Sequence, residues 1–244
     1  MNTQFFCRFL TSKMYYVFNT FMIISQENSQ QSTITEKGKI NKFSTTALME
    51  VSRKGQTDTV KALLEKGADI HEKDGHKSTA LIYASENGHI DTVNTLINNG
   101  ANVNDRNNQG WTPLMFASRD GYIEIVDTLL ENGAGASINE KNKQGCWTAL
   151  MYACRKGHID IVKALLENGA EISINEKSVY GRTALMYACG KAHTDIVKAL
   201  LEKGASISEK NNDNETALDI ARRKNSDHIV QLLESSPMSK SARM

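Results

Sequence analysis

Apolar residues between about residue 44 and residue 236 recur with a helical period, inside a unit that appears six times along the chain. In the second unit, one apolar helical face contains Leu81 and Ala84, and after Gly88 a second apolar face contains Val93 and Leu96. Polar residues occupy the positions between them. Each unit therefore predicts two short helices.

Each unit begins with Thr-Ala-Leu or Thr-Pro-Leu, at intervals of 33, 33, 36, 35 and 33 residues. A threonine hydroxyl at this place can accept a hydrogen bond from a free amide of the first turn, so the threonines predict helix N-caps. Neither helix can bury its apolar face within one unit. We therefore predict an all-α solenoid in which the units stack around a continuous core. The threonines are Thr46, Thr79, Thr112, Thr148, Thr183 and Thr216.

The repeated units divide the chain into three parts. Residues 44–236 hold six repeats, with expected bounds 44–77, 78–110, 111–145, 146–181, 182–214 and 215–236. The last repeat has Glu234 where the others have Leu or Ile, and a polar residue there favours a C-terminal cap. Residues 237–244 form a tail that we expect to be flexible.

Residues 1–43 combine an apolar leader with a polar linker and are expected to be poorly ordered. Within the apolar segment at residues 5–24, the uninterrupted part from Tyr15 to Ile24 has the length of a signal-peptide hydrophobic region but is short for a membrane span. Three interpretations stay open: a signal or anchor, an amphipathic membrane or partner helix, and a disordered or misassigned start. Membrane contact is expected only through residues 5–24. The chain is otherwise expected to be cytoplasmic, or membrane-associated or secreted if this segment is an anchor or a signal.

Composition narrows the classes of function. The chain has 29 basic and 28 acidic side chains, so its net charge of +1 gives no overall field that recruits nucleic acid or an anionic membrane. Its four cysteines, Cys7, Cys146, Cys154 and Cys189, are too few and too scattered to crosslink 244 residues. This cysteine usage favours a reducing compartment.

Catalytic and metal-binding motifs are missing from the sequence, which has no Gly-rich phosphate loop, paired zinc-ligand cysteines or serine-nucleophile elbow. Cys154 with His158, and Cys189 with His193, have the spacing of metal ligands on one helical face. The two cysteines occupy one equivalent position of the repeat and the two histidines another, so the repetition of the unit alone explains their spacing. We therefore expect no metal, no cofactor and no catalysis.

The repeated segments resemble the ankyrin repeat. The resemblance rests on Gly-Trp-Thr-Pro-Leu-Met-Phe-Ala-Ser at 110–118, on Gly-His-Ile-Asp-Ile-Val-Lys-Ala-Leu-Leu-Glu-Asn-Gly-Ala at 157–170, and on their counterparts in the other copies. It implies helix-turn-helix pairs joined by β-hairpin-like loops, and binding of a partner protein without catalysis. Added residues in two hairpins, near 135–137 and 172–174, are interpreted either as neutral loop drift or as longer fingers that reach a partner.

In ankyrin-repeat proteins the outer surface of the first helices and the hairpin tips line the concave groove that usually meets the partner. By this resemblance, the groove of consecutive repeats contains the aromatic residues Tyr83, Phe116, Tyr152 and Tyr187, and also Trp111 and Trp147, which precede the motif threonines. Aromatic side chains often dominate the energetics of interfaces. Packing between neighbouring repeats is the alternative role for them.

The groove positions carry nine basic and four acidic side chains, a balance of +5 on a chain of net charge +1. We therefore predict a monomeric, non-enzymatic scaffold that binds an acidic segment of another protein with apolar anchors. A membrane-tethered adaptor or secreted effector is the alternative, and RNA is a less favoured partner. The basic residues are Arg53, Lys54, Arg119, Arg155, Lys156, Arg182, Lys191, Arg223 and Lys224, and the acidic residues are Glu50, Glu86, Asp120 and Glu215. The predicted partner-binding residues are Trp111, Trp147, Tyr83, Phe116, Tyr152, Tyr187, Arg119, Arg155, Lys156, Arg182 and Lys191.

Overall fold

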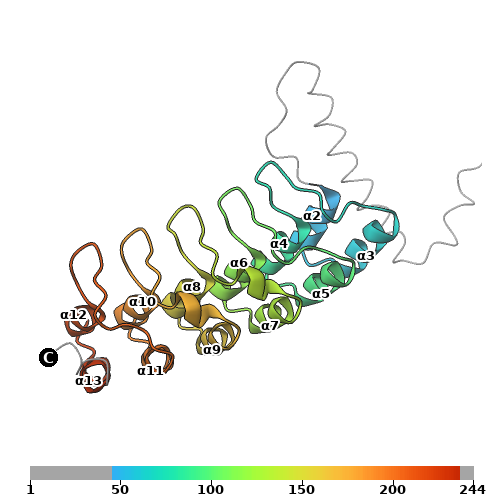
Figure 1. Cartoon of the computed structure of the whole chain (residues 1–244). Helices are drawn as coiled ribbons and strands as arrows, with labels where there is room; N and C mark the ends of the chain where they lie inside the picture. Colours follow the sequence, from blue (N-terminus) through green and yellow to red (C-terminus); the bar gives the residue numbers. More distant parts are fainter. Residues whose placement is uncertain (1–45, 237–244) are drawn as a thin grey trace, which may run out of the picture.

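The structure, a computed structural model, describes residues 46–236 (Figure 1). The expectations for the leader, the linker and the tail therefore lie outside the described residues. Within residues 46–236 the chain forms twelve α-helices, two short 3-10 helices and no strand. This confirms the all-α prediction. No helix of the described part has the length and apolar character needed to cross a membrane.

The α-helices form six consecutive pairs, which are called repeats 1 to 6 below. The first helices of the pairs are α2 (Ala47–Arg53), α4 (Ala80–Glu86), α6 (Pro113–Asp120), α8 (Ala149–Lys156), α10 (Ala184–Gly190) and α12 (Ala217–Arg223). The second helices are α3 (Thr57–Glu65), α5 (Ile90–Asn98), α7 (Ile123–Glu131), α9 (Ile159–Glu167), α11 (Thr194–Glu202) and α13 (Asp227–Ser235).

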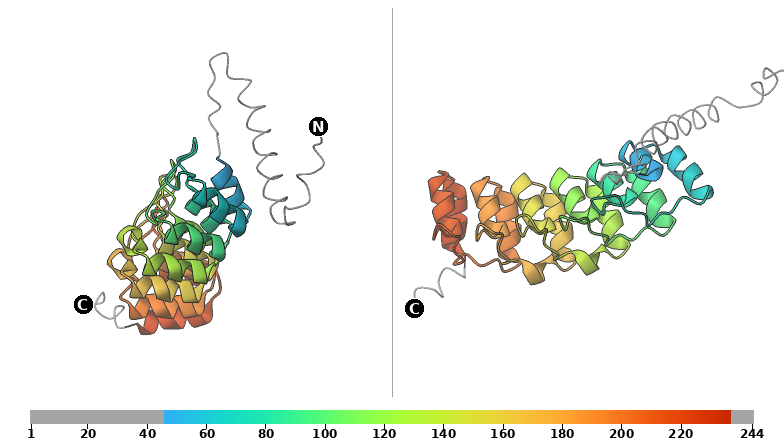
Figure 2. Two further views of the ribbon diagram at one scale, coloured as in Figure 1. Left: turned by 90° about the vertical axis from the view of Figure 1, so that its right-hand side faces the viewer. Right: turned by 90° about the horizontal axis from the view of Figure 1, so that it is seen from above.

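The first helices lie side by side in one row and the second helices in another, so the molecule is a two-layered solenoid (Figures 1 and 2). Helix α6, for example, contacts α4 and α8 in its own row and α7 in the other. Buried aliphatic side chains from both rows form one continuous core. Each repeat thus covers apolar surface of its neighbours, as the repeating pattern predicts.

Each first helix begins after the threonine that the sequence predicts as its N-cap. The Oγ1 of Thr112, for example, accepts a hydrogen bond from the backbone N–H of Met115 at 3.2 Å. In repeat 6 the cap is reciprocal, because the carboxylate of Asp219 also accepts from the backbone N–H of Thr216. The N-cap prediction is confirmed at all six threonines.

The turn between the two helices of repeat 4 has Gly157 in the left-handed region, with a φ of 90°, where glycine costs least. A Cβ atom at Gly157 would lie 2.7 Å from the imidazole of His193 in repeat 5. The Nε2 of His193 lies 3.4 Å from the backbone carbonyl oxygen of Arg155. Gly157 therefore permits the turn and also makes room for a ring that hydrogen bonds to helix α8. The same arrangement joins Gly55 to His89 and Gly121 to His158.

Loops that join successive repeats project from the row of first helices (Figure 1). Each loop is closed by a backbone hydrogen bond of its own, such as the bond from the Asn107 N–H to the Trp111 carbonyl oxygen at 3.1 Å. Neighbouring loops also bond to each other, and the Lys143 N–H donates to the Gln109 carbonyl oxygen at 2.8 Å. The loops are thus hairpin-like and form a laterally bonded row, although none of the described residues is assigned to a strand.

The added residues of repeats 3 and 4 form two 3-10 helices, η1 (Ala134–Ser137) and η2 (Ala170–Ser173), which directly follow α7 and α9. Ala134 and Ala170, which start these turns, are at most 1% exposed, whereas Ile172 is 85% exposed. The added residues therefore lie at the C-terminal ends of α7 and α9. This placement favours neutral loop drift, and longer fingers that reach a partner stay a prediction.

Candidate partner-binding groove

Five aromatic rings of repeats 3 to 5 form a continuous stack along the first helices. The Trp111 ring lies between Phe116 of its own repeat and Tyr152 of the next, with centroid distances of 4.6 and 4.7 Å. The Trp147 ring lies between Tyr152 and Tyr187 in the same way, at 4.9 and 4.2 Å. Each tryptophan therefore joins two adjacent repeats.

The stack buries most of these rings. Trp111, Trp147 and Tyr187 are each 7% exposed and Phe116 is 6% exposed, whereas Tyr83 and Tyr152 are half-buried. The resemblance to ankyrin repeats predicts both tryptophans at a surface position in the groove. The neighbouring repeat closes over them. Their contacts are those of packing between repeats.

The tyrosine hydroxyls of the groove hydrogen bond to the base of the loop that precedes their own helix. The pairs are Tyr83 with Asp74 (2.6 Å), Tyr152 with Asn142 (2.8 Å) and Tyr187 with Ser178 (2.9 Å). Burial raises the pKa of Tyr83 to about 12, with a further contribution from its bond to Asp74, and burial raises the pKa of Tyr152 to about 12. The phenols are therefore neutral at physiological pH, and their hydrogen bonds connect the loops to the first helices.

Arg119, a predicted partner-binding residue, is engaged within its own chain. Its guanidinium donates to both carboxylate oxygens of Asp120, at 2.9 and 2.6 Å, and lies 3.7 Å from Glu86. It also lies 5.0 Å from the ring centroids of Trp111 and Phe116. The hydrogen bonds to Asp120 raise the pKa of Arg119, and burial raises the pKa of Glu86. The charge of Arg119 is thus largely neutralised before any partner arrives.

The basic residues of repeats 4 to 6 lie in a different environment. Arg155, Lys156, Lys191 and Lys224 are exposed, and within residues 46–236 none of them forms an ion pair. The guanidinium of Arg155 lies 5.2 Å from the centroid of the Trp147 ring. Arginine over an aromatic face keeps its hydrogen-bond donors available while its position is fixed.

The excess positive charge of the groove therefore lies in one half. Groove positions of repeats 1 to 3 carry three basic and three acidic side chains, and those of repeats 4 to 6 carry six basic side chains and one acidic side chain. The whole balance of +5 belongs to repeats 4 to 6. In repeat 1, moreover, Glu50 pairs with both Arg53 and Lys54, each at 2.8 Å.

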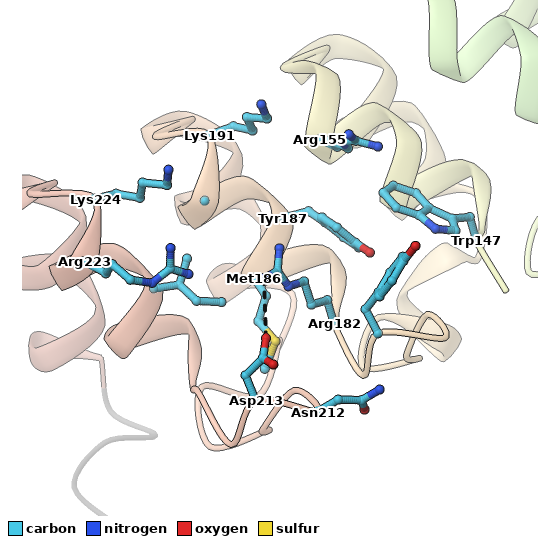
Figure 3. A pocket seen from close by; sticks show the side chains of 13 residues that line it. Trp147, Arg155, Arg182, Met186, Tyr187, Lys191, Asn212, Asp213, Arg223 and Lys224 are labelled. Atoms are coloured by element: carbon cyan, nitrogen blue, oxygen red, sulfur yellow. Dashed lines mark ion pairs between the residues drawn. The ribbon is translucent and has the colours of Figure 1, made fainter. Parts of the chain in front are cut away.

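A pocket of about 580 Å³ lies in the groove between repeats 5 and 6 (Figure 3). The buried side chains of Met186, Tyr187 and Ile220 line it, together with Trp147. Asp213 is the one acidic residue of the lining and lies 4.0 Å from Arg182. The basic residues of the lining are Arg155, Arg182, Lys191, Arg223 and Lys224.

The pocket also includes Tyr180 and Gly190, which sequence reasoning did not select. Gly190 leaves a recognisable signal in the sequence, because it stands where the other first helices have arginine or glutamate. Tyr180 carries no comparable signal. Its exposure follows from the course of a loop, which the helical period does not describe.

The cysteines of the two pairs with metal-ligand spacing, Cys154 with His158 and Cys189 with His193, are buried in the core. Cys154 is fully buried in the core, and desolvation raises the pKa of its thiol. The Nε2 of His158 lies 3.3 Å from the carbonyl oxygen of Arg119, on the repeat before its own. Within the described residues no cluster of three His, Cys, Asp or Glu side chains could hold a metal ion.

The fold and its charged groove define an α-helical repeat protein. The sequence profile of ankyrin repeats, in three copies, matches residues 20–107, 48–142, 99–176 and 173–241. The chain therefore belongs to the ankyrin-repeat family, which confirms the resemblance drawn from its sequence. Ankyrin repeats generally mediate protein–protein interactions, and their fold is typically a non-enzymatic interaction module.

Solved structures of similar chains cover 78% of this chain at a TM-score of 0.70. The crystal structure of the ankyrin repeat protein EF0377 is 35% identical and is covered over 96% of its length. An ankyrin repeat domain (ABAYE2397) from Acinetobacter baumannii AYE is 30% identical and is also covered over 96%. A chain in the complex of the predatory endopeptidase Bd0816 from Bdellovibrio bacteriovorus with the immunity protein Bd3460 is 27% identical and covered over 98%. A comparison with curated proteins finds no significant match.

Proposed function

We propose that the chain is a non-enzymatic binding module that holds an acidic segment of a partner protein in the groove of repeats 4 to 6. The observation that carries the proposal is the uneven charge of the groove. Six basic side chains there meet two acidic ones, Asp213 beside Arg182 and Glu215 beside Arg223. The other four, Arg155, Lys156, Lys191 and Lys224, have no carboxylate partner among the described residues. A positive patch without internal partners is complementary to carboxylates and steers an acidic chain toward it.

A protein partner is favoured over single-stranded RNA by the way the aromatic rings are packed. Proteins that bind single strands offer exposed aromatic faces on which bases stack. Here Trp111, Trp147 and Tyr187 stack on neighbouring side chains and are each 7% exposed. The complex of an endopeptidase with an immunity protein, which contains a similar chain, also supports a protein as the kind of partner.

The test measures binding of a fluorescein-labelled dodecapeptide, built of aspartate and glutamate around one central phenylalanine, to the full chain by fluorescence anisotropy. We expect the double variant Arg155→Glu/Lys156→Glu to weaken binding by about tenfold or more, because both cations would become like charges. The control is Lys61→Glu/Lys163→Glu, which changes the net charge equally on exposed positions of α3 and α9. Its affinity is expected to stay within about twofold of the wild type at physiological ionic strength.

Equal losses in the two double variants would overturn the proposal, because binding would then follow net charge and not the groove. A labelled oligouridylate that binds more tightly than the peptide, with a steep salt dependence, would identify a nucleic-acid site instead. Tryptophan-to-alanine variants are poorly suited to this test, since Trp111 and Trp147 pack between repeats and their loss would perturb folding.

A further inference from the structure

Gly190 interrupts a column of long charged side chains on the first helices. The equivalent residues of the other repeats are Arg53, Glu86, Arg119, Arg155 and Arg223. In repeats 3 and 4 the arginine of this column lies over the tryptophan of its own repeat, 5.0 and 5.2 Å from the ring centroid. Repeat 5 has no such pair, because it has Gly190 in the column and Arg182 in place of the tryptophan. The space between repeats 5 and 6 therefore stays open.

The backbone does not require glycine at this position. Gly190 ends α10 without a left-handed φ, and a Cβ atom there would lie 3.6 Å from Cγ2 of Ile220, an ordinary van der Waals contact. A Cβ atom at Gly157, by contrast, would lie only 2.7 Å from the ring of His193. The fold thus tolerates a larger residue at position 190, and the glycine leaves the pocket unfilled.

The aromatic stack ends at the same pocket. Tyr187 contacts Trp147 on one side, and repeat 6 supplies Ile220 at the position where repeats 2 to 5 have tyrosine or phenylalanine. Within the described residues no further ring therefore continues the stack beyond Tyr187. Tyr187 and Ile220 instead both line the pocket. An apolar surface there can receive a side chain from another molecule.

The loop that joins repeats 4 and 5 adds exposed apolar surface at the rim. Tyr180, which lines the pocket, is 62% exposed, and its neighbour Val179 is 47% exposed. The Val179 N–H donates to the Gly145 carbonyl oxygen at 3.0 Å, and the Asn212 N–H donates to the Tyr180 carbonyl oxygen at 3.1 Å. Backbone bonds on both sides therefore hold this loop tip in place. A preformed apolar rim favours binding, because the loop loses little conformational entropy when a partner binds.

We propose that this pocket receives one large apolar side chain, an aromatic ring in the best case, from an acidic segment of the partner, and that Gly190 determines this specificity. The proposal rests on the function proposed above. Carboxylates on either side of the anchor would meet Arg155, Lys191 and Lys224, which line the same pocket, so the anchor and the charges are recognised together. The volume of about 580 Å³ lies within the range of sites that enclose small ligands and accepts a ring with its neighbouring backbone.

The experiment compares two peptide probes on three forms of the full chain. The probes are the labelled acidic dodecapeptide with its central phenylalanine and a matched peptide with serine at that place. We expect the wild type to bind the phenylalanine peptide about tenfold more tightly, the gain expected from burying one large apolar side chain. Gly190→Gln fills the pocket with a neutral side chain of the length of Glu86, and it should abolish this preference. Gly190→Ala adds only a methyl group and should retain it.

The serine peptide keeps the two proposals separate. It should bind all three forms within about twofold, because their charges are the same. A preference for phenylalanine that persists in Gly190→Gln, or that is lost equally in Gly190→Ala, would overturn the assignment of the pocket and leave the acidic-segment proposal standing. Failure of both peptides to bind the wild type would overturn the proposed function itself, and the pocket assignment with it.

Discussion

The ring of Trp147 lies against the ring of Tyr187 with 4.2 Å between their centroids, and this contact joins repeat 4 to repeat 5. Because Trp147 also stacks on Tyr152, one side chain links residues of two first helices. In a solenoid the interfaces between neighbours supply much of the stability, since no single repeat can bury its own apolar surface.

Truncation of Trp147 should therefore lower the stability of the whole solenoid. We expect Trp147→Ala to reduce the free energy of unfolding by about 3 to 5 kcal/mol, because a large buried ring is lost from between two others. Trp147→Phe, which keeps a ring in the stack, should lose clearly less. Urea unfolding followed by circular dichroism measures both values. Equal losses for the two variants would contradict a stacking role.

Ala192 occupies the turn position that Gly157 has in repeat 4, with a φ of 60°. Alanine in the left-handed region costs about 1 kcal/mol, so Ala192→Gly should stabilise the chain by about that amount. The matched variant Gly157→Ala should destabilise by more, because its Cβ would also meet the ring of His193 at 2.7 Å. Urea unfolding distinguishes the two signs, and a loss of stability in Ala192→Gly would contradict the argument.

The Oγ atom of Ser118 is buried without a hydrogen-bond partner among the described residues. An unpaired buried hydroxyl costs about 1 to 3 kcal/mol, so Ser118→Ala is expected to raise the free energy of unfolding by about 1 kcal/mol. Ser178 provides the control, since its Oγ pairs with the hydroxyl of Tyr187 at 2.9 Å. Ser178→Ala should therefore destabilise the chain. The prediction fails if both variants shift the urea midpoint in the same direction.

Burial raises the pKa of the Cys189 thiol to about 12. An unfolded thiol ionises near about pH 8.5, so below that pH both states are protonated and the stabilising contribution is complete. As the pH rises toward 12 only the unfolded state ionises, and the free energy of unfolding falls, by about 2 kcal/mol at pH 10 for one thiol.

The variant Cys189→Ser places in repeat 5 the residue that repeats 1 to 3 have at this position, and it removes the titrating thiol. Its stability should therefore decrease less between pH 7.5 and pH 10 than that of the wild type, as measured by urea unfolding at both values. Parallel pH profiles for the two proteins would show that Cys189 does not titrate as its burial predicts.

The helices and their caps were predictable because their causes lie within one repeat. The hydroxyl of Thr112 caps the helix that follows it directly, and Leu81 and Ala84 share a face because of the helical period alone. Local chemistry of this kind is present in the sequence of each copy. Six copies in register then fixed the order of the elements along the chain.

The burial of the aromatic rings and the pocket were not predictable in the same way, because both depend on pairs of repeats. Trp111 stacks on Phe116 within its own repeat, but its second stacking partner, Tyr152, comes from the next repeat. The unequal state of Arg119 and Arg155 is partly local, because Asp120 directly follows Arg119 whereas Lys156 follows Arg155; only the contact of Arg119 with Glu86 depends on a second repeat. Comparison of equivalent positions between repeats identifies Gly190, but only the structure relates it to Ile220.

Gly190 and Ile220 together decide where along the solenoid the pocket lies. All six repeats share one backbone plan, so the location of the pocket depends on the residues at two positions and not on the path of the chain. Substitutions at the positions equivalent to Gly190 and Ile220 would therefore shift the pocket by one repeat and leave the backbone of the solenoid unchanged. The position of a binding site is then inherited separately from the architecture that supports it.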